Sequence, residues 1–276
     1  MQDPKQQISP RYSMNLEQRK NWYSPVADVY YKARAPYPQE LINRAVTLAQ
    51  LSSDAAILEV GCGPGNATVC FAQLGFSMTC LEPNQDLYHL ARRNCARYSA
   101  VEICNTSFEE WELEAKKFNA VLAANAFNWI PPEIGYSKAV QALQDNGCLI
   151  LLWNMSPEPR YEVYQAIEEV YQAYAPSLVH YEGAETQADI LRGFGQNILN
   201  SGCFRDLVSE QIACEVTYSS DNFFNLLSTG HLSTLQWLEP QTKDLLFERL
   251  REKLEDFGDN IQLSYLSAVQ IARKDG

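Results

Sequence analysis

Residues 57–65 read Ile-Leu-Glu-Val-Gly-Cys-Gly-Pro-Gly, and this stretch decides the fold that we expect. A short apolar segment runs directly into three glycines at alternate positions, Gly61, Gly63 and Gly65. This pattern is typical of a buried strand that ends in a tight turn with almost no side chains. It predicts the first half of a Rossmann-like unit, in which a ligand lies against the backbone of the turn.

The residues after the turn separate two classes of nucleotide-binding fold. Asn66 can cap a helix over residues 67–74, and Gly75 can end that helix in the left-handed conformation. A dinucleotide-binding turn, Gly-x-Gly-x-x-Gly, would have its third glycine at position 66, whereas here it comes one position earlier. The spacing Glu-x-Gly-x-Gly-x-Gly instead resembles the first motif of the class I S-adenosylmethionine (SAM) methyltransferases.

A second strand is predicted over residues 76–81, and it ends at Glu82. An ionised carboxylate accepts two hydrogen bonds side by side, which suits the two neighbouring hydroxyls of a ribose. Glycine turns also serve plain strand-to-helix packing, and a Glu at a strand end is commonly just solvated. The glycine turn and the carboxylate occur together and in this order, so we favour a ligand whose ribose lies at Glu82. The spacing of the glycines indicates that this ligand is SAM.

The composition predicts a globular protein, since 276 residues of which 46% are hydrophobic can bury a large core. A net charge of −12 disfavours nucleic acid as a partner, because such binding depends on clustered Lys and Arg. No apolar run approaches the roughly 18 residues of a membrane span, and the polar start of the chain does not predict a signal peptide. The eight cysteines form no Cys-x-x-Cys pair, so we expect reduced thiols, no metal site and a cytoplasmic protein.

Strands and helices continue to alternate beyond Glu82, as in a parallel sheet with helices on both faces. Further strands are expected at residues 101–105, 119–125, 148–153, 207–218 and 261–272. Helices are expected at residues 39–51, 85–98, 133–143, 160–175, 222–227 and 243–257, with a turn at 145–147 and an irregular polar stretch at 181–200. We predict a single domain, residues 1–276, made of an N-terminal tail and lid segment (1–37), a SAM-binding core (38–155), and C-terminal strands with inserted cap helices (156–276).

Four further motifs carry a resemblance to a family. They are Arg34-Ala35-Pro36-Tyr37-Pro38, Phe108-Glu109-Glu110-Trp111, Ala126-Phe127-Asn128-Trp129-Ile130 and Trp153-Asn154. Together with the glycine motif, they make the chain similar to the SAM-dependent methyltransferases of the type 11 group, and within it to the trans-aconitate methyltransferase-like branch. The chain departs from that branch where Ala35 replaces a proline and Asn128 replaces a histidine.

The resemblance implies an α/β fold, a Rossmann-like doubly wound sheet of seven strands whose last strand, residues 261–272, is antiparallel. It also implies SAM as the cofactor, with S-adenosyl-L-homocysteine (SAH) as product, lying across the strand ends. The residues that it assigns to the cofactor are Arg34 for the carboxylate, Glu59 for the amino group, Gly61, Cys62 and Gly63 for the methionine part, Glu82 with Pro83 for the ribose, Ser107 and Phe108 for the adenine, and Ala124 and Asn125 for the side of the reactive methyl group.

Methyl transfer from a sulfonium needs the nucleophile and the methyl group in line, about 3 Å apart, in a site without water. Asn128 can hydrogen-bond an acceptor there but cannot take a proton at neutral pH. His231 is the best placed of the three histidines to act as a base, although a lone histidine is more often structural. We therefore expect either an acceptor that is already ionised or a base located elsewhere.

The leading functional hypothesis is a SAM-dependent methyltransferase that acts on a small molecule, with O-methylation of a carboxylate or hydroxyl favoured. One alternative is methyl transfer to a carbon of a lipid or quinone. Another is a catalytically silent SAM-binding subunit that supports a partner enzyme. A measurement of methyl transfer would distinguish the silent subunit from the two enzymes. The sequence does not determine the oligomeric state.

Overall fold

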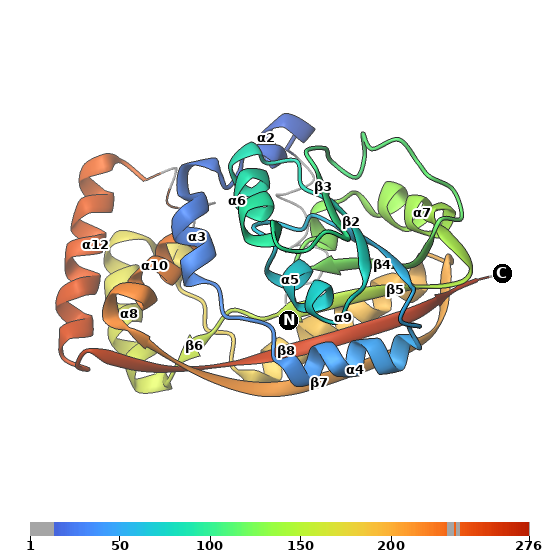
Figure 1. The fold of residues 1–276 in the computed structure, drawn as a ribbon. Coiled ribbons are helices and arrows are strands. Elements are labelled where there is room, and N and C mark those ends of the chain that lie inside the picture. The colour runs from blue at the N-terminus through green and yellow to red at the C-terminus, as the bar shows by residue number, and fades with distance from the viewer. Residues whose placement is uncertain (1–13, 231–234, 236–237, 276) are drawn as a thin grey trace.

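The computed structural model describes residues 14–230, 235 and 238–275, and its centre is an eight-stranded sheet (Figure 1). The strands run in the order β3-β2-β1-β4-β5-β8, and the short β6 and the long β7 also pair with β8, so the sheet has one strand more than the seven predicted. β1 to β5 are parallel, and β8 is antiparallel to β5, as predicted for the last strand. The strands are β1 (Ala56–Val60), β2 (Ser77–Leu81), β3 (Val101–Cys104), β4 (Phe118–Ala124), β5 (Leu143–Asn154), β6 (Glu158–Pro159), β7 (Phe204–Ser219) and β8 (Asn260–Lys274).

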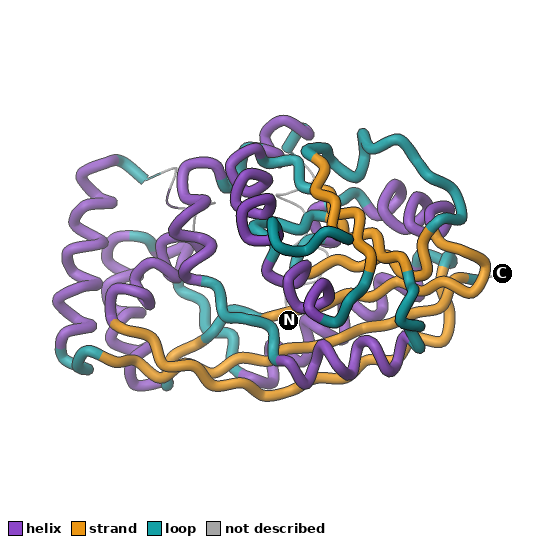
Figure 2. Tube along the Cα trace, viewed as in Figure 1, coloured by secondary structure: helices purple, strands orange, loops and turns teal. Residues whose placement is uncertain are grey.

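Helices cover both faces of the sheet, because successive strand residues point to opposite sides. Ile57 on β1 belongs to the apolar cluster of one layer, and its neighbour Leu58 belongs to the cluster of the other. The predicted doubly wound arrangement is therefore confirmed (Figure 2). The layers are built by α4 (Gln39–Ala49), α5 (Asn66–Gln73) and α6 (Gln85–Cys95) on one face, and by α7 (Pro132–Ala142) and α9 (Ala184–Asn200) on the other.

The glycine turn connects β1 to α5 in a slightly different way from the one expected. Asn66 is the first residue of the helix and does not cap it; the capping position is Gly65, whose φ of 91° is left-handed. A residue with a side chain would be strained there, and its Cβ would lie 3.0 Å from Cys95 Sγ on α6. Gly65 thus fixes both the direction of α5 and its close packing against α6.

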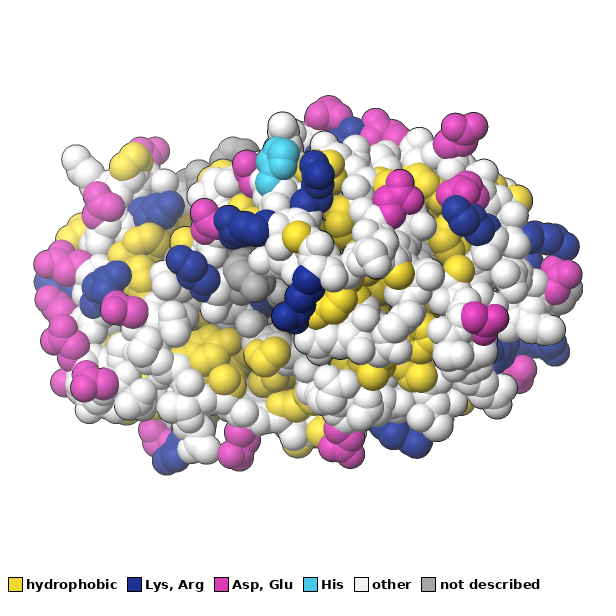
Figure 3. Space-filling model, in the orientation of Figure 1, with side chains coloured by type: hydrophobic (Ala, Val, Ile, Leu, Met, Phe, Trp, Pro, Cys, Tyr) yellow, Lys and Arg dark blue, Asp and Glu magenta, His cyan; other side chains and the backbone are white. Residues whose placement is uncertain are grey.

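A separate group of helices packs at one end of the sheet, on the left of Figure 1. These cap helices are α8 (Tyr161–Tyr174), α10 (Ser220–Gly230) and α12 (Pro240–Glu255), and they share an apolar cluster with the ends of β7 and β8. The outward side of α12 is acidic (Figure 3), since Asp244, Glu248, Glu252 and Glu255 are exposed. No helix in the described part of the chain is long and apolar enough to span a membrane.

The predicted irregular stretch at residues 181–200 is wrong, because most of it forms α9. Gly193 and Gly195 lower the helix propensity of this segment, which hides the helix in the sequence. The structure explains Gly195: an added Cβ would lie 3.1 Å from both Gln270 Nε2 and Leu207 Cδ2. Close packing of α9 against β8 and β7 therefore outweighs the loss of propensity.

Residues 145–147, which we expected to form a turn before a strand, lie within strand β5. Phe118 of β4 pairs with Leu143 of β5, and the next pair is Ala120 with Cys148. The two pairs are therefore two positions apart on β4 but five positions apart on β5. The intervening residues of β5 are therefore a bulge within one long strand and not the end of a helix-to-strand connection. Polar turn residues suit such a bulge because residues 144–146 are exposed.

Candidate functional site

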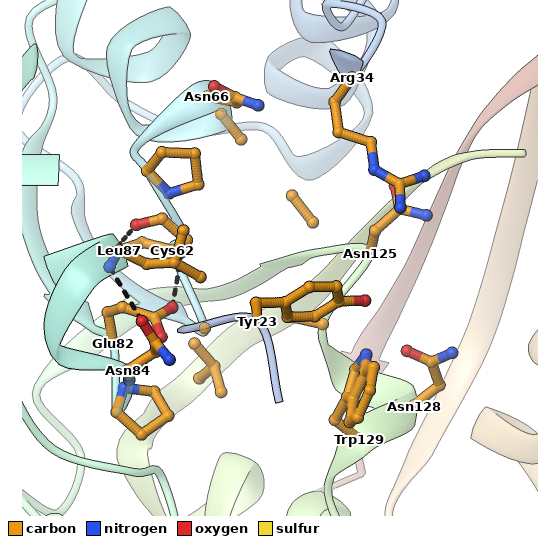
Figure 4. A pocket seen from close by; sticks show the side chains of 18 of the residues that line it. Tyr23, Arg34, Cys62, Asn66, Glu82, Asn84, Leu87, Asn125, Asn128 and Trp129 are labelled. Carbon is orange, nitrogen blue, oxygen red and sulfur yellow. Dashed lines mark hydrogen bonds between the residues drawn. The ribbon is translucent and has the colours of Figure 1, made fainter. Parts of the chain in front are cut away.

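A cavity of about 320 Å³ opens at the carboxyl ends of β1, β2 and β4 and is covered by the N-terminal segment (Figure 4). We call it the first cavity. Most of the residues that the sequence assigned to a ligand line it: Arg34, Gly61, Cys62, Gly63, Glu82, Pro83, Ser107, Phe108, Ala124, Asn125 and Asn128. Glu59 is not among the lining residues, and His231 lies outside the described residues.

The floor of the first cavity is the glycine turn, which is left-handed at two of the lining glycines. Gly61 has a φ of 66°, and a Cβ added to it would lie 2.7 Å from Ala126 Cβ, which is too close. Gly63 has a φ of 57°, and an added Cβ would meet no atom within 4 Å. Gly61 therefore lets the turn after β4 approach, whereas Gly63 keeps open space for a ligand against the backbone.

Glu82 closes one side of the turn. Its Oε2 accepts a hydrogen bond from the Gly63 N–H at 2.8 Å, and its Oε1 accepts one from the Asn84 N–H at 2.8 Å. Burial raises the pKa of the Glu82 carboxyl to about 7, and the two backbone hydrogen bonds oppose this rise. Each oxygen still has a lone pair for a further donor, so the carboxylate can receive two hydroxyls.

Glu59 is buried behind the turn. Its Oε2 accepts hydrogen bonds from Thr68 Oγ1 at 2.5 Å and from Cys80 Sγ at 3.6 Å, while Oε1 has no partner among the described residues. Burial raises the pKa of this carboxyl to about 7. Glu59 is buried and is not among the described residues that line the first cavity, so its expected position near a ligand's amino group stays a prediction, while its bond to Thr68 ties the start of α5 to β1.

Asn125 organises the far side of the first cavity. It has a left-handed φ of 51°, and its Oδ1 accepts hydrogen bonds from Tyr37 Oη and from the Asn154 N–H, both at 2.7 Å. Asn154 Nδ2 in turn donates to the Ala35 carbonyl at 3.0 Å. The motifs at residues 34–38 and 153–154 therefore meet in one network. The sequence showed these motifs but gave Tyr37 and Asn154 no role.

The N-terminal segment forms a lid over the first cavity. It contains α2 (Leu16–Lys20), η1 (Ser24–Val26) and α3 (Ala27–Ala33). Arg19 pairs with Glu109 at 2.8 Å, Lys20 pairs with Glu110 at 2.6 Å, and Asn84 Nδ2 donates to the Lys20 carbonyl at 2.8 Å. Arg19 and Lys20 line the first cavity, and no sequence motif marked them.

Aromatic side chains complete the lid. The Tyr23 ring meets Trp129 of η2 (Phe127–Trp129) edge-on, with ring centroids 5.7 Å apart. Next to Trp129, the Asn128 Oδ1 is buried and has no hydrogen-bond partner among the described residues. The turn after β4 therefore presents both an aromatic face and an unsatisfied amide oxygen at the site.

The described residues of the cap helices do not line the first cavity. Among the described residues that line it, none comes from α8, α10 or α12. Strands β7 and β8 hold the segment before α4 in place: Tyr218 Oη on β7 donates to the Ala33 carbonyl at 2.9 Å, and Tyr265 Oη on β8 donates to the Pro36 carbonyl at 3.4 Å. These contacts position Arg34 between them.

Residues 57–147 match the family model of a methyltransferase domain. An uncharacterized methyltransferase of Mycobacterium tuberculosis is 26% identical over 136 residues, which are 49% of this chain and 53% of that protein. The match therefore spans about half the length of that curated relative. A malonyl-[acyl-carrier protein] O-methyltransferase of a Paenibacillus species is 26% identical over 235 residues, covering 81% of this chain and 80% of that protein.

A solved structure shares the fold. It is phosphoethanolamine N-methyltransferase 2 of Haemonchus contortus, in complex with phosphomonomethylethanolamine and SAH. The TM-score is 0.53 at 14% identity, over 94% of this chain and 59% of that one. At this identity the likeness concerns the fold alone.

Proposed function

We propose that this chain, which carries a class I SAM-dependent methyltransferase domain, transfers the methyl group of SAM to an oxygen of a small-molecule acceptor. The domain match confirms the class that the glycine motif predicted, and with it the cofactor. The trans-aconitate-like branch stays a prediction. The relative that aligns over 81% of this chain is named as an O-methyltransferase, which supports oxygen as the accepting atom.

The observation that carries the proposal is the separation of charged groups across the glycine turn. In the view of Figure 4, Glu82 lies on one side of the first cavity and Arg34 lies on the other. SAM has matching groups at its two ends, a ribose diol and an amino-acid carboxylate. The open space at Gly63 and the remaining lone pairs of Glu82 support this fit.

The residues of the chain have to hold and enclose the reactants. When bound, SAM supplies a methyl group on a positively charged sulfur. Glu82 and Arg34 would fix the two ends of the molecule, while the faces of Tyr23 and Trp129 favour positive charge and exclude water. Asn128 would receive a hydrogen bond from the acceptor and set its direction of approach.

The first test is ligand binding measured by thermal melting. SAM and SAH are expected to raise the melting temperature of the purified protein, and NAD is not, because position 66 lacks the glycine that a dinucleotide turn requires. A ligand at about a hundred times its dissociation constant adds roughly 2.7 kcal/mol to the free energy of unfolding. A shift with NAD and none with either sulfur compound would refute the proposal.

A second prediction concerns Asn128→Ala, followed by SAH release in a screen of acceptors. Loss of one neutral hydrogen bond costs about 0.5 to 1.5 kcal/mol, so kcat/KM should fall roughly 2- to 12-fold. SAM affinity should stay nearly unchanged, and the rate should show no titration near pH 6 to 7, because an amide does not titrate. A large loss of SAM affinity would instead assign Asn128 to the cofactor.

If His231→Ala abolished turnover and the wild-type rate rose with a single pKa near 6.5, His231 would be the base. The expectation of an acceptor that is already ionised would then be wrong.

A further inference from the structure

A second cavity, of about 670 Å³, lies between α7, β5 and α9. Its walls are mainly apolar and aromatic and include Phe127, Tyr136, Trp153 and Phe194. Among the described residues that line it, Glu133 is the one charged side chain, and it is exposed. Cavities of this size and composition are typical of sites for small organic molecules.

The second cavity adjoins the first one at the turn after β4. Asn128 and Ile130 line both cavities, so these two residues form the boundary between them. The Asn128 Oδ1 is buried at this boundary without a hydrogen-bond partner among the described residues. A buried amide oxygen without a donor is unfavourable, and an O–H or N–H group of a ligand would satisfy it.

We propose that the second cavity holds the body of the methyl acceptor, that this body is uncharged and aromatic or aliphatic, and that a hydroxyl or N–H group on it, separate from the oxygen that takes the methyl group, donates to Asn128 Oδ1. This inference rests on the proposed function, because it uses the first cavity as the place of the reactive methyl group. Aromatic walls favour a planar body. An anionic body would lose its hydration without gaining a cationic partner there.

The probe for this site is 2-naphthol, which has a planar apolar body and one hydroxyl. Its binding to the protein, with and without SAH, is measured by calorimetry, and 2-naphthoate serves as a probe of similar shape whose carboxylate cannot donate. Asn197 on α9 lines the second cavity and is half-buried, so Asn197→Trp should fill the space. Gln196 is its exposed neighbour on the same helix and does not line the cavity, so Gln196→Trp is the matched control.

We expect saturable binding of 2-naphthol, at least tenfold weaker binding of 2-naphthoate, and at least a tenfold loss of 2-naphthol affinity in Asn197→Trp. SAH affinity should stay within twofold in both variants, which also shows that they are folded. Gln196→Trp should bind 2-naphthol like the wild type. Equal 2-naphthol affinity in Asn197→Trp and wild type, no saturable binding to the wild type, or equal binding of the two probes would each overturn the proposal.

A measurement on the wild type keeps the test independent of the variants. Cys203 lines the second cavity and is half-buried, so N-ethylmaleimide should alkylate it more slowly when 2-naphthol is bound, as followed by peptide mass spectrometry. SAH alone should not protect Cys203. An alkylation rate that 2-naphthol leaves unchanged would overturn the proposal even if Asn197→Trp failed to fold. If neither SAM nor SAH bound, the proposed function would be overturned. The binding of 2-naphthol in the absence of SAH would still show whether the second cavity takes a planar apolar ligand.

Discussion

A chain that ends at Asp259 is expected to be insoluble and to bind no SAM. The deletion removes β8, which pairs with β5, β6 and β7 and therefore joins the C-terminal part of the sheet to the rest. Burial of a large apolar side chain contributes about 1.5 to 3 kcal/mol, and net stabilities are only about 5 to 15 kcal/mol. The deletion would remove several such side chains, namely Ile261, Leu263, Leu266, Val269 and Ile271.

The control for this deletion is a chain that ends at Lys274, which keeps the whole of β8. It should be soluble and bind SAM like the full chain, because every pair of the β8 ladder remains. Solubility after expression, far-UV circular dichroism and SAM titration check both chains. If the chain that ends at Asp259 stayed soluble and bound SAM, β8 would not be the strand that completes the sheet.

The central part of the fold was predictable because its signals are local. The apolar segment, the glycines at alternate positions and Glu82 all lie within 26 residues, from Ile57 to Glu82, and the expected strands and helix form there, with Gly65 in place of Asn66 at the capping position. The last strand was predictable for the same reason, since residues 261–272 are apolar over most of their length. Period and spacing were sufficient for these elements.

The parts that were missed depend on contacts between distant residues. Arg19 meets Glu109, 90 positions later, and no local pattern marks an arginine in a short polar helix as part of a cavity wall. A glycine is needed at position 195 because Gln270 and Leu207, which belong to other elements, pack closely against α9 there. The buried position of Glu59 was also hidden, because its motif specifies the residue type but not whether the side chain points into the cavity or away from it.

The second large effect is expected from Glu82→Ala, which should weaken SAM binding about 10- to 150-fold. This range corresponds to the roughly 1.5 to 3 kcal/mol of a hydrogen bond to a charged group. The variant also leaves the N–H groups of Gly63 and Asn84 without their acceptor, so Glu82→Gln is needed as a milder change. Glu102→Ala is the matched control, because Glu102 is an exposed carboxylate on the neighbouring strand β3.

The pH dependence of SAM binding separates a ribose contact from a merely structural role of Glu82. Burial raises the pKa of this carboxyl from 4.5 to about 7 in the unliganded protein. The protonated carboxyl therefore contributes to folding stability fully below about pH 4.5, and this contribution is lost as the pH rises to about 7. Ribose hydroxyls donate to the ionised form, and binding should therefore release a proton below pH 7. The affinity of the wild type relative to Glu82→Gln should rise between pH 5.5 and 7 by up to about tenfold per pH unit and level off above pH 8. Calorimetric titration across this range measures the ratio, and a ratio that does not change with pH would show that Glu82 shapes the turn without touching the cofactor.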